Sequence, residues 1–337
     1  MGMTDQDFET ALAAKIDTKT KPLGALGRME TLAAQVARVQ GSLTPKMETC
    51  QLTIFAADHG IARAGVSAFP PEVTRQMVLN FASGGAAANV FCAANDVALR
   101  VVNAGVLGGP FDMDGVLDAP IAEGTANSLE GPAMTPAQRD AAFDQGRALG
   151  QDGAADAVAF GEMGIGNTSA ATLIAHMLTG QDVRTLTGRG TGLDDPGLTE
   201  KQKTLAAAAA RCSGLTDPAE VMCEYGGFEI AMITGAMLGA AEAKRIVLVD
   251  GFIASAAALV AARIDPSSRD AMVFAHRSAE PGHAAILDAL DADPLLDLGM
   301  RLGEGTGAVL AWPLVKSAVA MLNDMASFES AGVSGKA

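Results

Sequence analysis

Short apolar runs alternate with longer helical patterns along this chain of 337 residues. Five of the runs are rich in β-branched residues and apolar throughout, which is typical of strands that are covered on both faces. They are residues 52–57, 97–103, 157–160, 246–249 and 272–275. Because helical stretches separate them, the pattern predicts an α/β domain with a mostly parallel sheet flanked by helices.

Capping residues mark two of the expected helices. Thr135 stands three residues before Gln138, the spacing of a capping box, with proline at the first helical position between them. A second helix is expected to open at the prolines before Glu72 and to stop at residues 83–85, after which another begins. Residues 105–134 show no periodicity and contain many Gly, Pro and Asp, so we expect a long surface excursion there.

Both ends of the chain are helical by pattern. The first 45 residues are polar and helical, and residues 308–328 form an amphipathic pattern. We therefore expect a catalytic domain over residues 46–307 and a small helical domain built from residues 1–45 together with 308–337.

The charge of the chain limits its partners. The formal net charge is −15 and the pI is about 4.6, a field that repels nucleic acids and anionic membrane surfaces. We expect neither as a partner, and an anionic substrate must be held by helix N-termini and a few well-placed cations. The four cysteines lack CxxC spacing and the first residues lack a long apolar stretch, which favours a cytoplasmic protein with reduced thiols.

Polar residues follow nearly every predicted strand. Asp58 follows the first strand, Glu162 the third, Asp250 the fourth and Ser278 the fifth. Ligands of parallel sheets bind at the carboxyl ends of the strands, so these residues are expected to border one site.

Three glycine-rich segments, at residues 161–168, 188–192 and 303–307, are candidates for binding an anion. The first leads from a strand into a helix, so its amides and the helix N-terminus favour phosphate binding; the alternative is a tight turn without a ligand. The other two match neither a Walker loop nor GxGxxG, because the third glycine comes one residue early, which disfavours a dinucleotide fold.

Two glutamates stand in these segments. Glu304 lies between two glycines at the start of an apolar helix, which leaves its carboxylate accessible as a general base. The alternative is a carboxylate that only binds backbone amides or pairs with Arg301. Glu162 allows the same two interpretations.

The histidines give little support for a metal site. His176 lies on an apolar helix and is expected in or near the core. A site built from Asp58, His59, His276 and His283 is conceivable, but no HExxH motif or tight histidine pair supports it. We expect no metal and no cofactor.

Motifs along nearly the whole chain resemble those of the nicotinate-nucleotide–dimethylbenzimidazole phosphoribosyltransferase family, which makes the lower-ligand nucleotide of cobalamin. They include KPLGALGRMETLA, AADHGIARAGVSAFPPEVTRQM, GEMGIGNTSAATLI, GRGTGLDD, AHRSAEPGH and RLGEGTGAVLA. Ala25 departs from the serine common in the first motif. The resemblance implies a Rossmann-like large domain, a small helical domain and a homodimer.

The resemblance also implies roles for particular residues. Glu304 is expected to be the catalytic base and Glu162 to lie near the ribose and the reacting centre. The phosphate is expected near Gly164, Gly190, Lys201 and Ser278, and the benzimidazole-type base near Ser67, Gln76 and Leu302. Five further substrate-binding residues are expected in the same loops: Gly166, Asn167, Thr191, Gly192 and Asp250.

Two other functions stay open at this stage. A Rossmann-type nucleotide-dependent oxidoreductase predicts GxGxxG after the first strand, where this chain has DHGIARAG instead. A protein that binds a base or nucleotide without catalysis would be free to lose both glutamates, which are present.

Overall fold

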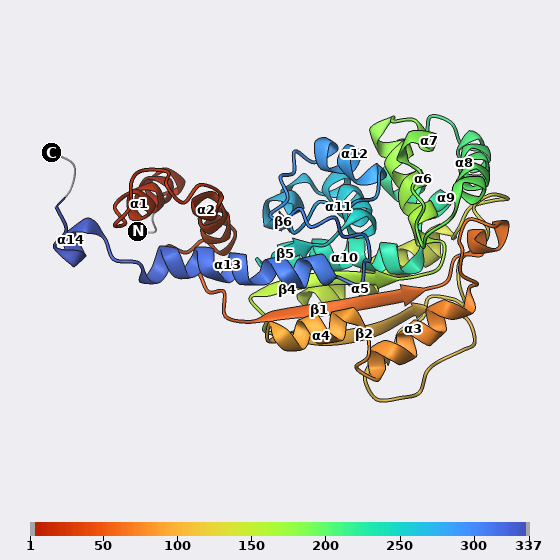
Figure 1. The fold of residues 1–337 in the computed structure, drawn as a ribbon, viewed down its shortest axis with the longest axis horizontal. Coiled ribbons are helices and arrows are strands. Elements are labelled where there is room, and N and C mark those ends of the chain that lie inside the picture. The colour runs from red at the N-terminus through yellow and green to blue at the C-terminus, as the bar shows by residue number, and fades with distance from the viewer. Residues whose placement is uncertain (1–3, 335–337) are drawn as a thin grey trace.

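The computed structural model describes residues 4–334, and its centre is a parallel sheet (Figure 1). The strand order is β3-β2-β1-β4-β5-β6, with every neighbouring pair parallel. The strands are β1 (Cys50–Ala57), β2 (Val97–Gly105), β3 (Val116–Asp118), β4 (Ala157–Met163), β5 (Ile246–Val249) and β6 (Met272–Phe274). The predicted fold class is confirmed, and all five predicted strands are present with small differences at their ends.

Strand β3 was not predicted, because it lies inside the segment that we interpreted as a surface excursion without regular structure. It has only three residues and pairs with β2 at the edge of the sheet. Contacts distant in sequence hold it there: the Asp118 carboxylate accepts hydrogen bonds from Asn103 Nδ2 at 2.7 Å and from the Phe111 N–H at 2.9 Å. A half-exposed strand of this length produces no apolar pattern.

Helices cover both faces of the sheet (Figure 1). The α-helices are α1 (Asp5–Asp17), α2 (Arg28–Gln40), α3 (Glu72–Ala82), α4 (Ala87–Ala94), α5 (Pro136–Gln151), α6 (Asn167–Thr179), α7 (Val183–Leu186), α8 (Asp195–Ala210), α9 (Pro218–Tyr225), α10 (Phe228–Glu242), α11 (Phe252–Ile264), α12 (Gly282–Ala289), α13 (Thr306–Asp324) and α14 (Phe328–Ala331). Two 3₁₀ helices are η1 (Gly60–Ala64) and η2 (Pro266–Ala271).

The alternation of side chains along β1 divides the core into two apolar clusters. Leu52 and Ile54 belong to one cluster, with residues of α2, α4 and α13. Phe55 and Ala57 belong to the other, with residues of α6, α10 and α11. Since both faces are covered in this way, the strands are apolar at almost every position.

The helices from the two chain ends pack together, away from α6–α9 (Figure 1). Helix α13 begins against β4 and β5 and continues to α2, so Leu32 and Val319 share one apolar cluster with Leu52 of the sheet. A backbone bridge also joins Lys19 to Ser327. The division into a catalytic and a small helical domain stays a prediction.

Both expected helix starts are confirmed. The Thr135 side chain accepts the N–H of Gln138 in a capping box, and α3 begins at Glu72 and ends before the break at residues 83–86. The stretch Glu72–Ala94 has the length and hydropathy of a membrane span. In the structure it is divided into helices of 11 and 8 residues, and a span needs about 20 in one helix.

Candidate active site

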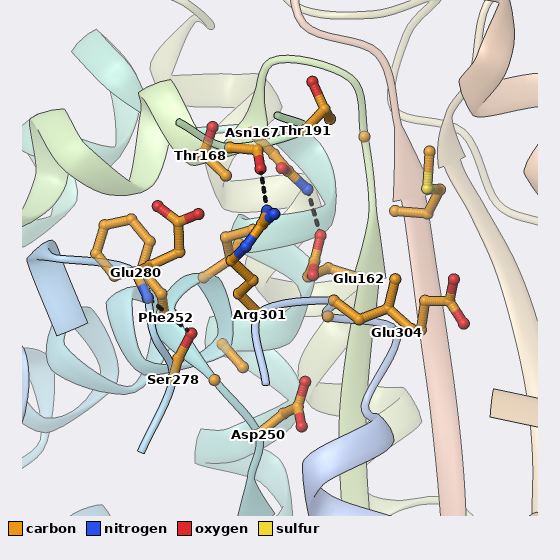
Figure 2. Close-up of a pocket in the computed structure, with 18 of the residues that line it drawn as sticks. Glu162, Asn167, Thr168, Thr191, Asp250, Phe252, Ser278, Glu280, Arg301 and Glu304 are labelled. Carbon is orange, nitrogen blue, oxygen red and sulfur yellow. Dashed lines mark hydrogen bonds between the residues drawn. The ribbon is translucent and has the colours of Figure 1, made fainter. Parts of the chain in front are cut away.

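A cavity of about 440 Å³ opens at the carboxyl ends of β4, β5 and β6 (Figure 2). Its wall is formed by the β4–α6 junction, the segments after β5 and β6, the turn before α13 and one side of α3. The structure therefore brings together the segments that follow three predicted strands, as expected for a parallel sheet.

Nine of the predicted site residues line this cavity. They are Glu162, Gly164, Asn167, Gly190, Thr191, Asp250, Ser278, Leu302 and Glu304. They come from five separate segments of the chain, and only the fold makes them neighbours.

Glu162 is the penultimate residue of β4, and its side chain is buried at the cavity wall. Its Oε2 accepts a hydrogen bond from Asn167 Nδ2, at the first residue of α6. Burial raises the pKa of Glu162 well above its ordinary value, and the carboxylates of Glu229 and Asp250 raise it further. An ionised Glu162 is thus an unfavourable state that a nearby positive charge would stabilise.

Glu304 lies in a turn in which three consecutive residues have left-handed backbone angles. The φ values are +88° at Gly303, +62° at Glu304 and +78° at Gly305. Such a backbone is unfavourable for a glutamate by roughly 1–2 kcal/mol, so the turn must be held by its surroundings. Its side chain is buried and directed away from Glu162 (Figure 2), and its carboxylate reaches Ala88 of α4.

The Glu304 carboxylate has few partners. Its Oε2 accepts the N–H of Ala88 in α4 at a long 3.3 Å. Arg301, the alternative ion-pair partner, instead donates from Nη1 to the Gly190 carbonyl at 2.9 Å. Burial raises the pKa of Glu304, the Ala88 hydrogen bond opposes this rise, and the charge of Asp250 adds to it.

A buried lysine lies behind the 188–192 loop. Lys201 is 1% exposed, and its Nζ donates to Thr168 Oγ1 at 2.9 Å. A Cβ added to Gly190 would lie 3.2 Å from this nitrogen, so the backbone of the loop passes close to the ammonium. Burial lowers the pKa of Lys201 to about 8, against the opposing attraction of Glu280. An ammonium with one hydrogen bond is suited to bind an anion.

Glu280 lines the cavity and was missed at the sequence level. It is buried, and its Oε2 has no hydrogen-bond partner among the described residues. Burial raises its pKa, whereas the charges of Lys201 and Arg301 lower it. Two signals could have found it: its place after the fifth predicted strand and its place in the AHRSAEPGH motif. Its closeness to Lys201 depends on how distant segments pack.

The mouth of the cavity has an apolar wall. Phe69 and Leu302 are 52% and 57% exposed, and Met77 and Met163 lie beside them on the lining. Leu, Met and Phe are the residue types expected for the slot of a flat base in a chain with few aromatic residues.

Five predicted site residues lie outside the cavity lining. Lys201 is behind it, as described. Ser67 Oγ lies 3.0 Å from Thr191 Oγ1, at the rim, and Gln76 is exposed on α3 next to the lining residue Met77. Gly166 precedes α6 with φ +99°, and Gly192 has φ +109° with open space around it. Their substrate-binding roles stay predictions.

The histidines have protein partners. His59 Nε2 lies 2.6 Å from Glu229 Oε1, both fully enclosed. His283 bonds Ser255 and the Ser278 N–H, and burial lowers its pKa to about 3. Among residues 4–334, no group of three or more His, Cys, Asp or Glu side chains is arranged to hold a metal.

Comparison with known proteins agrees with this geometry. A family model described as "Phosphoribosyltransferase" matches residues 1–333. The nicotinate-nucleotide–dimethylbenzimidazole phosphoribosyltransferases of Aromatoleum aromaticum and Dechloromonas aromatica are 54% and 55% identical, over 99% and 100% of this chain and 98% of each relative. A crystal structure of CobT from Thermus thermophilus is 43% identical with a TM-score of 0.94, covering 98% of this chain and 99% of that one.

These matches cover both chain ends as well as the cavity, so the whole chain and not one motif carries the likeness. The chain belongs to the family of nicotinate-nucleotide–dimethylbenzimidazole phosphoribosyltransferases.

Proposed function

We propose that this enzyme transfers the phosphoribosyl group of nicotinate mononucleotide to 5,6-dimethylbenzimidazole. The products are α-ribazole 5′-phosphate, nicotinate and a proton. The observation that carries the proposal is the placement of Glu162 and Glu304: two buried carboxylates on one cavity, with the ammonium of Lys201 behind an adjoining wall.

The donor supplies a good leaving group. Nicotinate mononucleotide is an N-glycosyl pyridinium, and when its C1′–N bond breaks, the electron pair returns to the ring nitrogen, which leaves neutral. The leaving group therefore needs no general acid. Positive charge develops at C1′, as in glycoside chemistry.

Glu162 is suited to stabilise that charge. Its ionised form is disfavoured in the empty site by burial and by neighbouring carboxylates. A bound pyridinium and the oxocarbenium-like centre would offset this penalty, so the carboxylate interacts most strongly as the transition state forms. Asn167 holds the carboxylate in place.

Glu304 completes the transfer as a general base. The unprotonated ring nitrogen of the benzimidazole attacks C1′ from the face opposite to nicotinate, which inverts the β-glycosidic bond to α. The other ring nitrogen then carries an acidic N–H, whose proton passes to the Glu304 carboxylate. General base catalysis of this kind contributes about 100- to 10,000-fold.

The remaining residues position the two substrates. We assign the phosphate to Lys201, Ser278, the amides near Gly164, just before α6, and the amides near Gly190, in the loop between α7 and α8. The apolar wall that includes Leu302 receives the flat base. Ser67 and Gln76 are assigned to the base as well, and Gly166, Asn167, Thr191, Gly192 and Asp250 are proposed as further substrate contacts.

The test is to mix the purified protein with nicotinate mononucleotide and a panel of bases, including adenine, and to measure free nicotinate. Base-dependent release of nicotinate with formation of an α-nucleoside is expected. Binding without release would favour a protein that only carries the nucleotide, and a change in reduced-nicotinamide absorbance with alcohols would favour an oxidoreductase.

We also propose that the enzyme is a cytoplasmic homodimer. Light scattering is expected to give roughly twice the chain mass of 34.2 kDa. A mass equal to that of one chain at micromolar concentration would contradict this assignment.

A further inference from the structure

The carboxylate of Asp250 lies at the start of α13, directly behind the turn that carries Glu304. Asp250 follows β5 and is 2% exposed. Its Oδ1 accepts the N–H of Ala308 at 3.0 Å, and the nearby N–H groups of Gly307 and Gly305 lower the pKa of this carboxylate against the rise that burial causes. An anion at a helix N-terminus is favourable because the first N–H groups have no partner within the helix.

The turn of residues 303–305 requires contacts that hold its left-handed backbone in place. Relaxation of Glu304 from its left-handed backbone to a right-handed one would relieve strain and swing its carboxylate away from its present place. Neighbouring strands limit this movement sterically. A Cβ added to Gly161 of β4 would lie 2.5 Å from the Glu304 carbonyl carbon and oxygen, so β4 presses against the turn from one side.

Steric contacts of this kind prevent the turn from moving toward the sheet but do not prevent it from moving away from the sheet. Gly161 and the Leu52 side chain lie on the sheet side of the turn, and Thr306 Oγ1 bonds back to Gly303 within it. The hydrogen bonds of Asp250 reach the backbone on the α13 side and connect it to the end of β5.

We propose that Asp250 is a positioning residue, whose carboxylate holds the N–H groups at the start of α13 and thereby fixes Glu304 at the cavity wall. The inference rests on the proposed function and changes the role expected for Asp250, which was that of a substrate contact. The strained left-handed turn holds the Glu304 base in position for catalysis, and Asp250 keeps the turn in this conformation.

Asp250 contributes a hydrogen-bond acceptor for the turn and a negative charge that acts on its neighbours, and two substitutions separate these contributions. His276 Nε2 lies 3.6 Å from Asp250 Oδ1, Glu162 faces the same cavity, and the Asp250 charge raises the pKa of both Glu162 and Glu304. Asparagine would keep an oxygen that accepts the Ala308 N–H but would remove the charge. Alanine would remove both.

The experiment compares Asp250→Ala and Asp250→Asn with the wild type in steady-state transfer from nicotinate mononucleotide to dimethylbenzimidazole. Asp250→Ala is expected to lower kcat about a hundredfold, the loss typical of a misplaced catalytic group, with KM for the nucleotide within threefold. Asp250→Asn is expected to recover most of this kcat, and the acid limb of its kcat/KM profile is expected to move to lower pH.

A matched control is Asp156→Ala, which removes another aspartate that accepts a backbone N–H, from Glu48 at 2.8 Å, just before the start of β4 and outside the cavity lining. It is expected to lower thermal stability and leave kcat within threefold. An Asp250→Ala kcat within threefold of the wild type, or a rise of KM alone in both Asp250 variants, would overturn the inference. If Asp250→Ala does not fold, a rise of KM with unchanged kcat in Asp250→Asn overturns it, because a substrate contact and not a positioning residue would respond in that way. Absence of nicotinate release by the wild type would instead refute the proposed function itself.

Discussion

Replacement of Lys201 by methionine is expected to stabilise the empty protein while weakening the binding of its nucleotide donor. Lys201 is 1% exposed, and burial lowers its pKa from 10.5 to about 8. That difference corresponds to roughly 3 kcal/mol by which the folded protein is destabilised when this ammonium is charged. Methionine has a similar stem and needs no solvation, and it gives up the hydrogen bond to Thr168 and the attraction of the Glu280 carboxylate.

The pH dependence of this effect has a definite sign. Because the pKa of Lys201 is lower in the folded than in the unfolded state, the destabilisation is fully present below pH 8. It disappears as the pH rises from about 8 to 10.5, where the folded protein holds the neutral amine. The Lys201→Met variant is therefore expected to be about 1–3 kcal/mol more stable than the wild type at pH 7, and this advantage is expected to shrink by pH 10.

The donor is expected to respond in the opposite direction. Loss of one or two charge-assisted hydrogen bonds to the phosphate, each worth about 1.5–3 kcal/mol, corresponds to a rise in KM for nicotinate mononucleotide of roughly 10- to 100-fold or more. Urea unfolding at pH 7 and pH 10 and steady-state kinetics measure the two effects. Lys203→Met is the control, because Lys203 is exposed on the same helix and pairs with Glu200. A Lys201→Met variant that is less stable at pH 7 with an unchanged KM would refute this reasoning.

Three further outcomes are expected. The kcat/KM profile should fall on the acid side at a pH above the ordinary pKa of a glutamate, because burial raises the pKa of Glu304 and the base must be ionised; an inflection below pH 4.5 would contradict this. Gly150→Ala should lower the free energy of unfolding by about 1–3 kcal/mol, because a Cβ there would collide with the Ala236 carbonyl oxygen. Chemical denaturation measures this loss. Gly131→Ala is the control, because Gly131 lies in open space, and it should change the free energy of unfolding by less than about 0.5 kcal/mol. Thr135→Ala should lower it by about 1 kcal/mol through loss of the N-cap, and unchanged unfolding would show that the cap is dispensable.

The sheet could be predicted from the sequence because its central strands are buried on both faces. Residues such as Leu52 and Phe55 point to opposite apolar clusters, so a continuous apolar run results, and this pattern is local. Strand β3 escaped detection because its stability comes from the Asp118 side chain and from Asn103, fifteen residues away. Contacts of this kind leave no periodicity in the sequence.

Site residues could be predicted from the sequence where a reactive side chain stands in a glycine-rich turn or directly after a predicted strand. Glycine neighbours singled out Glu304, and the end of a predicted strand singled out Glu162. Two features depend on the packing of distant segments, which no local pattern encodes: Glu280 Oε2 has no hydrogen-bond partner among residues 4–334, and Arg301 bonds to Gly190. The left-handed backbone of Glu304 was likewise unforeseen, since glutamate rarely adopts it.

The role of Glu304 as the base is tested most directly by single-turnover transfer in Glu304→Gln, with nucleotide binding measured by calorimetry on the same preparation. The amide keeps the size of the side chain but cannot accept the proton of the benzimidazole N–H. A transfer rate about 100- to 10,000-fold below that of the wild type, with Kd for nicotinate mononucleotide within threefold, is predicted. A rate within tenfold of the wild type would show that the proton leaves by another route and would remove Glu304 from the mechanism.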